Sequence, residues 1–140
     1  MTRFSKWAIR LSLGYMLIGF TIGGLMLANK GFLILPSVPL YLPVHIEYMM
    51  VGWFIHLIFG VAYWMFPRFT PKETGLRPRG FVRAAWGSLL LLNIGLVIFT
   101  TGQLVTDKLW FRFLGRSFEV IGTLAFFVNL WPRIKPVKKP

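Results

Sequence analysis

The two histidines of the chain, His45 and His56, lie in one hydrophobic stretch that ends at Pro67. That stretch is long enough to cross a bilayer. An imidazole in hydrocarbon is costly unless it has a partner, so a histidine inside a membrane span indicates a functional site. Imidazole nitrogen is a standard axial ligand of haem iron, and this is the first chemistry that the two residues suggest.

The spacing of the histidines limits what they can bind together. They are eleven residues apart, which on a regular α-helix separates them by about 20° around the axis and roughly 16 Å along it. They would then face the same way at different depths. The two axial bonds of a haem point in opposite directions, so one helix cannot supply both. A site with two histidine ligands therefore requires a second chain.

Each histidine also has a structural interpretation. His45 can be an interfacial residue that bonds water or lipid headgroups, and this stays open beside haem ligation. His56 can be a buried residue that bonds a carbonyl or hydroxyl group of a neighbouring helix. For His56 this structural role is favoured over a role as a metal ligand.

The composition predicts the elements that must position these residues. The chain has 140 residues, of which 56% are hydrophobic and 14% charged, whereas a soluble domain has about 25% charged residues. The apolar residues fall into four blocks, each near the roughly 20 residues that span a bilayer. We predict a single all-α domain over residues 1–140, a four-helix transmembrane bundle with spans at about 7–28, 45–66, 81–101 and 111–131.

The basic residues predict the orientation of this bundle. With four spans, 12 of the 16 Lys and Arg residues fall on one side, and by the positive-inside rule both termini are cytoplasmic, in a cell membrane of prokaryotic type. The basic faces favour anionic membrane lipids as partners, and we predict no nucleic-acid binding. The 12 are Arg3, Lys6, Arg10, Arg68, Lys72, Arg77, Arg79, Arg83, Arg133, Lys135, Lys138 and Lys139. The other side receives Lys30, Lys108, Arg112 and Arg116.

Small residues predict where helices approach closely. Gly19 and Gly23 form a Gly-x-x-x-Gly step on the first span, a pattern that permits close helix packing. Gly52 follows His45 by seven residues and would project on nearly the same face. Besides helix packing, a glycine at that position can leave room for a flat ligand.

Charged residues near the start of the fourth span form the second candidate feature. Arg112 and Arg116 are one turn apart, at the predicted depth of His45, where they could hold haem propionates, because arginine pairs well with carboxylates. The alternative is an anchor that extends to the lipid headgroups. Glu119 can pair with Arg116, and Glu47 with Arg112 or Arg116 of another helix. No chain of acids and hydroxyls for proton conduction is evident.

The second span resembles a known helix. The residues that carry the resemblance are His45-x6-Gly52-Trp53-x6-Gly60-x2-Tyr63-x2-Phe66-Pro67-Arg68. The string resembles the second transmembrane helix of the catalytic subunit of haem-copper oxidases, in the cbb-type and nitric-oxide-reductase-like branch. The resemblance implies that His45 is an axial ligand of a low-spin haem b. That catalytic subunit has about twelve helices, and the later ones, which carry its copper and active-site haem ligands, have no counterpart among these four.

These observations predict an integral membrane protein that binds haem b through His45 and transfers electrons. It is not expected to be an enzyme on its own, because the oxidase active-site ligands are missing. The partner would be a second copy, giving a homodimer, or other subunits of a respiratory-type complex. The alternatives are an accessory or structural subunit without a cofactor and, with few intramembrane polar residues to support it, a small transporter.

Overall fold

The computed structural model describes residues 1–32, 38–67, 81–106 and 108–134. Within these ranges, four helical segments are long and apolar enough to cross a membrane, which confirms the predicted all-α bundle. The elements are α1 (Arg3–Phe32), α2 (Val38–Glu47), η1 (Tyr48–Ile55), α3 (His56–Met65), α5 (Val82–Thr101), η2 (Gly102–Thr106), α6 (Leu109–Leu130) and η3 (Trp131–Arg133). Several basic residues of the predicted cytoplasmic face lie outside the described ranges: Arg68, Lys72, Arg77, Arg79, Lys135, Lys138 and Lys139.

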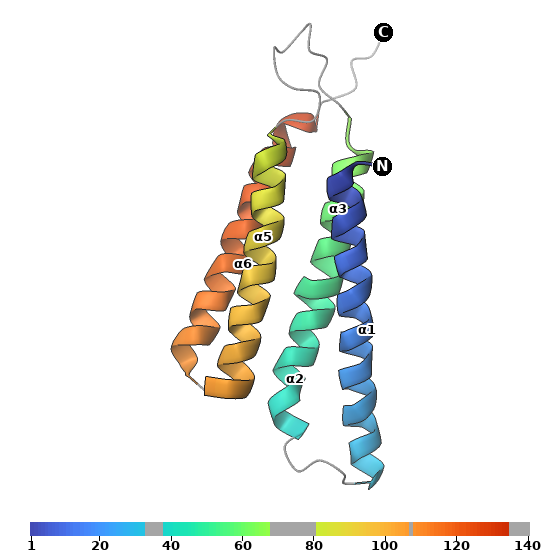
Figure 1. The fold of residues 1–140 in the computed structure, drawn as a ribbon, viewed down its shortest axis with the longest axis vertical. Helices are drawn as coiled ribbons and strands as arrows, with labels where there is room; N and C mark the ends of the chain where they lie inside the picture. Colours follow the sequence, from blue (N-terminus) through green and yellow to red (C-terminus); the bar gives the residue numbers. More distant parts are fainter. Residues whose placement is uncertain (33–37, 68–80, 107, 135–140) are drawn as a thin grey trace, which may run out of the picture.

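The helices form two hairpins that lie side by side (Figure 1). In the first hairpin, α1 packs along the whole of the second span, which consists of α2, η1 and α3 in continuous succession. In the second hairpin, α5 packs against α6. Consequently α1 begins and α6 ends at the same end of the bundle, which is the arrangement that an even number of spans with short connections produces.

The hydrophobic core that joins the hairpins is concentrated toward this end. The rings of Phe59 and Phe126 stack across the interface with their centroids 3.8 Å apart, and the ring of Phe4 packs against that of Tyr63 with centroids 4.6 Å apart. Ala8 of α1 lies against Gly60 of α3, where a Cβ atom added to the glycine would be 3.3 Å from the Cβ of Ala8. The buried cluster is Phe4, Ala8, Phe59, Tyr63, Ala85, Leu89, Leu92, Phe126 and Leu130.

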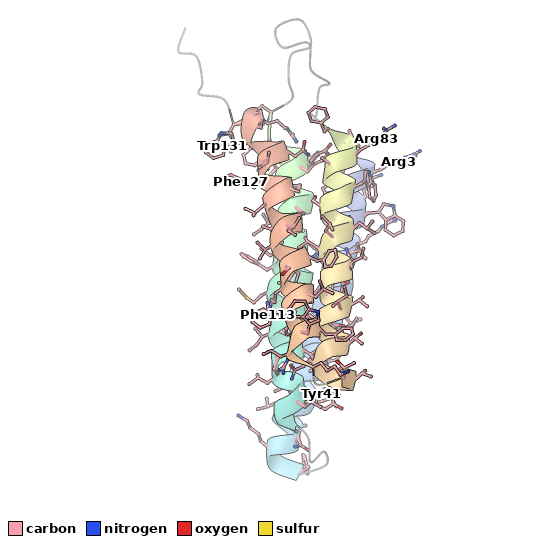
Figure 2. All side chains as sticks on the ribbon, turned by 90° about the vertical axis from the view of Figure 1, so that its left-hand side faces the viewer. Arg3, Tyr41, Arg83, Phe113, Phe127 and Trp131 are labelled. Carbon is pink, nitrogen blue, oxygen red and sulfur yellow. The ribbon has the colours of Figure 1, made fainter. Side chains whose placement is uncertain are left out.

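The outward faces of the helices carry large apolar side chains, as expected of surfaces that face lipid. Figure 2 shows side chains along the full length of the bundle, with Arg3, Arg83 and Trp131 near one end and Tyr41 near the other. Five tryptophans near the ends of the spans are all exposed, consistent with an aromatic belt. They are Trp7, Trp64, Trp86, Trp110 and Trp131.

The second span begins earlier than predicted. The span was predicted to begin at about residue 45, but α2 starts at Val38 and contains Pro43. Pro39 lies in the first turn, where backbone N–H groups have no acceptor within the helix in any case. Pro43 removes one further hydrogen bond, a cost that the long apolar span tolerates. His45 is therefore in the third turn of its helix and does not open it.

The second span is also irregular at its centre. Residues Tyr48–Ile55 form a π-helix, in which each N–H bonds to the carbonyl five residues earlier. The carbonyl of Trp53 accepts an additional hydrogen bond from the Ser12 hydroxyl of α1, at 3.0 Å. Because the π-helix lies between His45 and His56, the angular spacing calculated for a regular α-helix does not apply to them.

Candidate functional site

His45 lies against the Gly-x-x-x-Gly step of α1. Its Nδ1 atom is 2.8 Å from the carbonyl oxygen of Gly19. A Cβ atom added at Gly23 would lie only 2.7 Å from His45 Cε1, so the ring occupies the space that this glycine leaves. The close helix approach predicted for Gly19 and Gly23 is therefore present. The imidazole of His45 packs against these two glycines.

This contact determines which ring nitrogen of His45 carries a proton. A carbonyl oxygen can only accept, so Nδ1 is the donor. In the neutral imidazole, Nε2 then has a free lone pair, and it forms no hydrogen bond to any of the residues that the structure describes. Histidines that bind metals typically donate their other N–H to a carbonyl or carboxylate in this way. The ring is half-buried, with Nδ1 engaged by α1 and Nε2 left without a hydrogen-bond partner among the described residues.

The space beside Gly52 is filled and offers no room for a flat ligand. A Cβ atom at Gly52 would meet the Tyr15 ring of α1, with Cγ at 2.7 Å. The expectation that this glycine leaves a ligand space is therefore wrong within a single chain. The absence of a side chain at Gly52 instead allows the Tyr15 ring of α1 to pack against the second span. This is the helix-packing role that was the other interpretation of this glycine.

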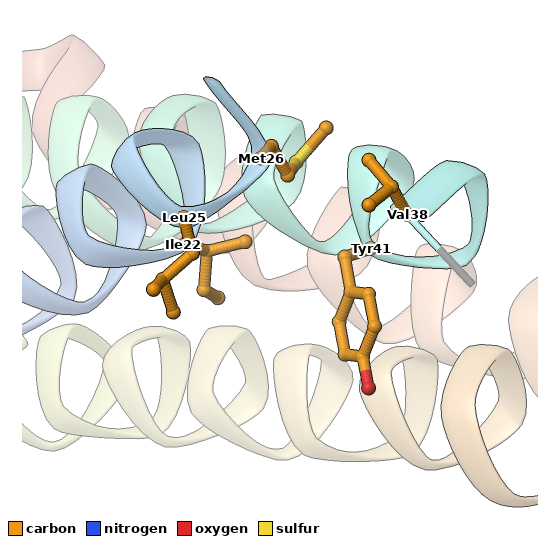
Figure 3. Close-up of a pocket in the computed structure, with 5 residues that line it drawn as sticks. All are labelled: Ile22, Leu25, Met26, Val38 and Tyr41. Carbon is orange, nitrogen blue, oxygen red and sulfur yellow. The ribbon is translucent and has the colours of Figure 1, made fainter. Parts of the chain in front are cut away.

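An apolar pocket lies one turn from His45 in sequence, at the end of the bundle away from the main core. It has a volume of about 180 Å³ and is formed by side chains of α1 and α2 (Figure 3). Ligand pockets for molecules of drug size usually measure about 300–1,000 Å³, so this pocket does not enclose a haem. Its lining residues are Ile22, Leu25, Met26, Val38 and Tyr41.

The two arginines predicted to hold propionates have partners within the chain. Arg116 forms a bidentate pair with Glu47, with Nη1 2.9 Å from Oε1 and Nη2 2.6 Å from Oε2. This is one of the two pairings that the sequence suggested for Glu47. Arg112 donates from Nη1 to Gln103 Oε1 at 3.1 Å. A propionate at Arg116 would have to compete with Glu47, and the propionate role of both arginines stays a prediction.

His56 belongs to a buried polar network. Its Nδ1 donates to the Val51 carbonyl at 2.9 Å, and Asn93 Nδ2 of α5 lies 3.0 Å from its Nε2. Asn93 Oδ1 accepts from the Tyr15 hydroxyl at 2.7 Å. Both ring nitrogens are thus occupied, and a metal at Nε2 would have to displace Asn93. His56 is thus buried and hydrogen-bonded, but its partners are a carbonyl of its own span and the Asn93 amide rather than a carbonyl or hydroxyl group of a neighbouring helix.

Asn93, Tyr15 and Arg133 were missed as important polar residues at the sequence level. Asn93 is the only asparagine within the third span, and a lone amide in an apolar span is a signal that it pairs with another helix. Arg133 gave no such signal, because it follows Pro132 at a span end that is rich in basic residues. Its burial depends on tertiary contacts with α3.

Within the described residues, no three His, Cys, Asp or Glu side chains are grouped so as to hold a metal ion. A site built on His45 would therefore contain one ligand from each chain. Comparison of the chain with protein-family models, with curated proteins and with solved structures found no match.

Proposed function

We propose that this chain is a haem b-binding membrane protein of a prokaryotic-type cell membrane that transfers electrons. His45 is the axial ligand, as the resemblance of the second span to haem-copper oxidases implies. The observation that carries the proposal is the hydrogen bond from His45 Nδ1 to the Gly19 carbonyl, which leaves the Nε2 lone pair available. Bound haem would supply one-electron chemistry, and the chain holds and orients the imidazole.

The residues present fit a shared haem better than one enclosed by a single chain. His45 supplies one axial bond, and the spaces near it within the bundle are filled or small. The neighbouring side chains of Leu42 and Ile46 are exposed on the outside of the bundle. The second axial ligand would come from a second copy of His45 or from another subunit of a respiratory-type complex, with the haem at the interface.

The absorption spectrum of the purified protein tests this proposal. After reconstitution with haemin in detergent, we expect the Soret and α bands of a six-coordinate b-type haem on reduction. Native mass spectrometry should show one haem for two chains, or a stable complex with another subunit. Failure to bind haem would contradict the proposal, and a monomer with a six-coordinate haem would contradict the shared site.

The predicted orientation of the bundle can be tested by labelling. The chain contains no cysteine, so single cysteines give no background. Because the basic end is expected in the cytoplasm, Lys72→Cys should resist a membrane-impermeant maleimide in intact cells, whereas Ser37→Cys should react. Both should react after the cells are permeabilised. The opposite pattern in intact cells would place His45 toward the cytoplasmic surface.

A second candidate function is an accessory subunit without a cofactor. The observation that favours it is that Arg116 and both nitrogens of His56 are already engaged by groups of the same chain. Such pairing stabilises a bundle without any ligand. The haemin experiment distinguishes the two candidates, because an accessory subunit of this kind would give no b-type spectrum at stoichiometric haemin.

A further inference from the structure

Three cations lie on one face of the first turns of α1. Arg3, Lys6 and Arg10 are spaced by three and four residues, so they project within about 60° of one another around the helix. All three side chains are exposed, whereas Phe4 and Ala8, on the other side of the helix, are buried. The start of α1 therefore has a buried apolar side and an exposed basic side.

Arg83 of α5 extends the basic side of α1 onto a second helix. Arg83 is the second residue of α5 and is exposed. The ring of Phe4 packs against that of Trp86, one turn after Arg83, with centroids 5.7 Å apart. Figure 2 shows Arg3 and Arg83 at the same end of the bundle and on the same side of it. We define the basic face by its four residues, Arg3, Lys6, Arg10 and Arg83.

The basic face forms no ion pair with an acid among the described residues. The two acids that the structure describes, Glu47 and Glu119, both contact Arg116, at 2.6 and 3.6 Å. The first turn of α1 contains no acid, and its N–H groups add the positive end of the helix dipole. The positive charges of the basic face are therefore balanced from outside the described part of the chain.

The side chain of Arg10 extends toward the end of the bundle. Arg10 follows Arg3 by seven residues, which places its backbone about 10 Å deeper along the helix. Its guanidinium carbon nevertheless lies over the Trp7 ring, 5.9 Å from the centroid, which is within the range of a cation–π contact. Because Trp7 is nearer the start of the helix, this contact brings the charge of Arg10 toward the level of Arg3.

The start of α1 is held in place, and exposed aromatic rings lie beside its cations. The backbone N–H of Ser5 donates to Thr2 Oγ1 at 3.0 Å, which caps the helix. Trp7 and Trp86 are 51% and 39% exposed and lie about one turn deeper than the outermost cations. Tryptophan at this depth is typical of the boundary between lipid headgroups and acyl chains. The cations of the basic face are thus at the level expected for lipid phosphates.

We propose that the basic face binds the headgroup of an anionic phospholipid of the surrounding bilayer. The phosphate accepts hydrogen bonds from the arginines, which pair well with phosphate oxygens, and the first carbons of the acyl chains lie over Trp7 and Trp86. Charge complementarity identifies the class of lipid, since basic residues at a membrane surface attract anionic headgroups.

A lipid matches the basic face better than a soluble anion does. The cations lie directly beside exposed tryptophans, so a ligand with a phosphate and an apolar tail satisfies both kinds of side chain. The inference does not depend on haem. His45 packs against Gly19 and Gly23, which lie at least nine residues further along α1 than any residue of the basic face.

Native mass spectrometry of the purified protein in a non-ionic detergent tests the inference. The protein is titrated with phosphatidylglycerol, which is anionic, or with phosphatidylcholine of the same chain length, which has no net charge. Each basic residue near a headgroup contributes roughly a fivefold factor, so the wild type should bind the first phosphatidylglycerol more than about 25-fold more tightly than phosphatidylcholine. Arg3→Gln combined with Arg83→Gln should weaken phosphatidylglycerol binding by about 25-fold.

Lys30→Gln combined with Lys108→Gln is the matched control, because it removes two exposed cations that lie outside the basic face. Lys30 is about 40 Å from Arg3 along α1, so the control should change phosphatidylglycerol binding by less than about twofold. An equal loss in the two double variants would indicate general charge attraction and would overturn the site. Equal affinity of the wild type for the two lipids would overturn it whether or not the variants fold.

Glycerol 3-phosphate, a headgroup without acyl chains, distinguishes the lipid from a soluble anion. At the concentration at which phosphatidylglycerol saturates the wild type, it should form no adduct, because it has no apolar part to contact Trp7 and Trp86. An adduct of similar affinity would assign the basic face to a soluble phosphate and overturn the proposal.

Discussion

Replacing His45 by alanine is expected to abolish haem binding, with the loss of the Soret and α bands. The imidazole is the one axial ligand that the proposed site draws from each chain, and its Nε2 atom is the free nitrogen of the ring. Loss of an outer-shell partner alone typically lowers metal affinity by roughly 10–100-fold, so loss of the ligand itself should lower haem affinity by at least about tenfold. Titration of the detergent-solubilised variant with haemin, followed by absorption, measures the effect.

Two comparisons separate ligation from structural damage. His56→Gln is the matched control, because glutamine retains an acceptor for Asn93, and it should keep the wild-type spectrum. Free imidazole added to His45→Ala should restore a six-coordinate spectrum, because it can enter the space left beside Gly23. Full haem retention in His45→Ala would show that the iron is bound elsewhere and would contradict the assignment of His45 as its ligand.

Replacing Arg133 by alanine is expected to destabilise the bundle by about 3 kcal/mol, since hydrogen bonds from charged donors contribute roughly 1.5–3 kcal/mol each and are not additive. Arg133 is only 1% exposed. Its guanidinium donates to the carbonyl oxygens of Tyr63, Phe66 and Pro67 at 3.1, 2.6 and 3.0 Å. These carbonyls lie at the C-terminal end of α3, where the last carbonyl groups lack N–H donors within the helix and the helix dipole is negative.

The stability of the variants can be measured by SDS titration in mixed micelles, followed by circular dichroism. Arg133→Lys should lie between the wild type and Arg133→Ala, because lysine keeps the charge but not the planar group that reaches three carbonyls. Arg83→Ala removes an exposed arginine at the same end of the bundle and should change stability by less than about 0.5 kcal/mol. Equal midpoints for Arg133→Ala and Arg83→Ala would contradict this role.

Hydropathy predicted the four spans because the cost of burying a polar backbone in lipid leaves few alternatives to a long apolar helix. It could not predict the early start of α2, since prolines near a helix start are compatible with both helix and extended chain. The π-helical turns of η1 also escaped prediction. The Trp53 carbonyl within them accepts a hydrogen bond from Ser12, a contact between residues far apart in the sequence that hydropathy does not reveal.

The candidate site was predictable in part. The Gly-x-x-x-Gly step and His45 were both evident in the sequence, but nothing in the spacing indicated that the imidazole would lie on that step. Glu47 had two possible arginine partners, and only the packing of α6 against the second span selects Arg116. At Gly52 the sequence left both helix packing and a ligand space open, because nothing in it indicated that Tyr15, 37 residues away, fills the space beside this glycine.

The division into two hairpins has a consequence for biogenesis. As the chain is synthesised, the first hairpin already contains the Gly19 partner of His45, so this imidazole is oriented before the third span emerges. His56 and Glu47 must wait, because Asn93 and Arg116 belong to the second hairpin. Until then they are polar groups in hydrocarbon without their final partners. Satisfying them favours docking of the later hairpin in one register, so two polar contacts guide the last assembly step of an otherwise apolar protein.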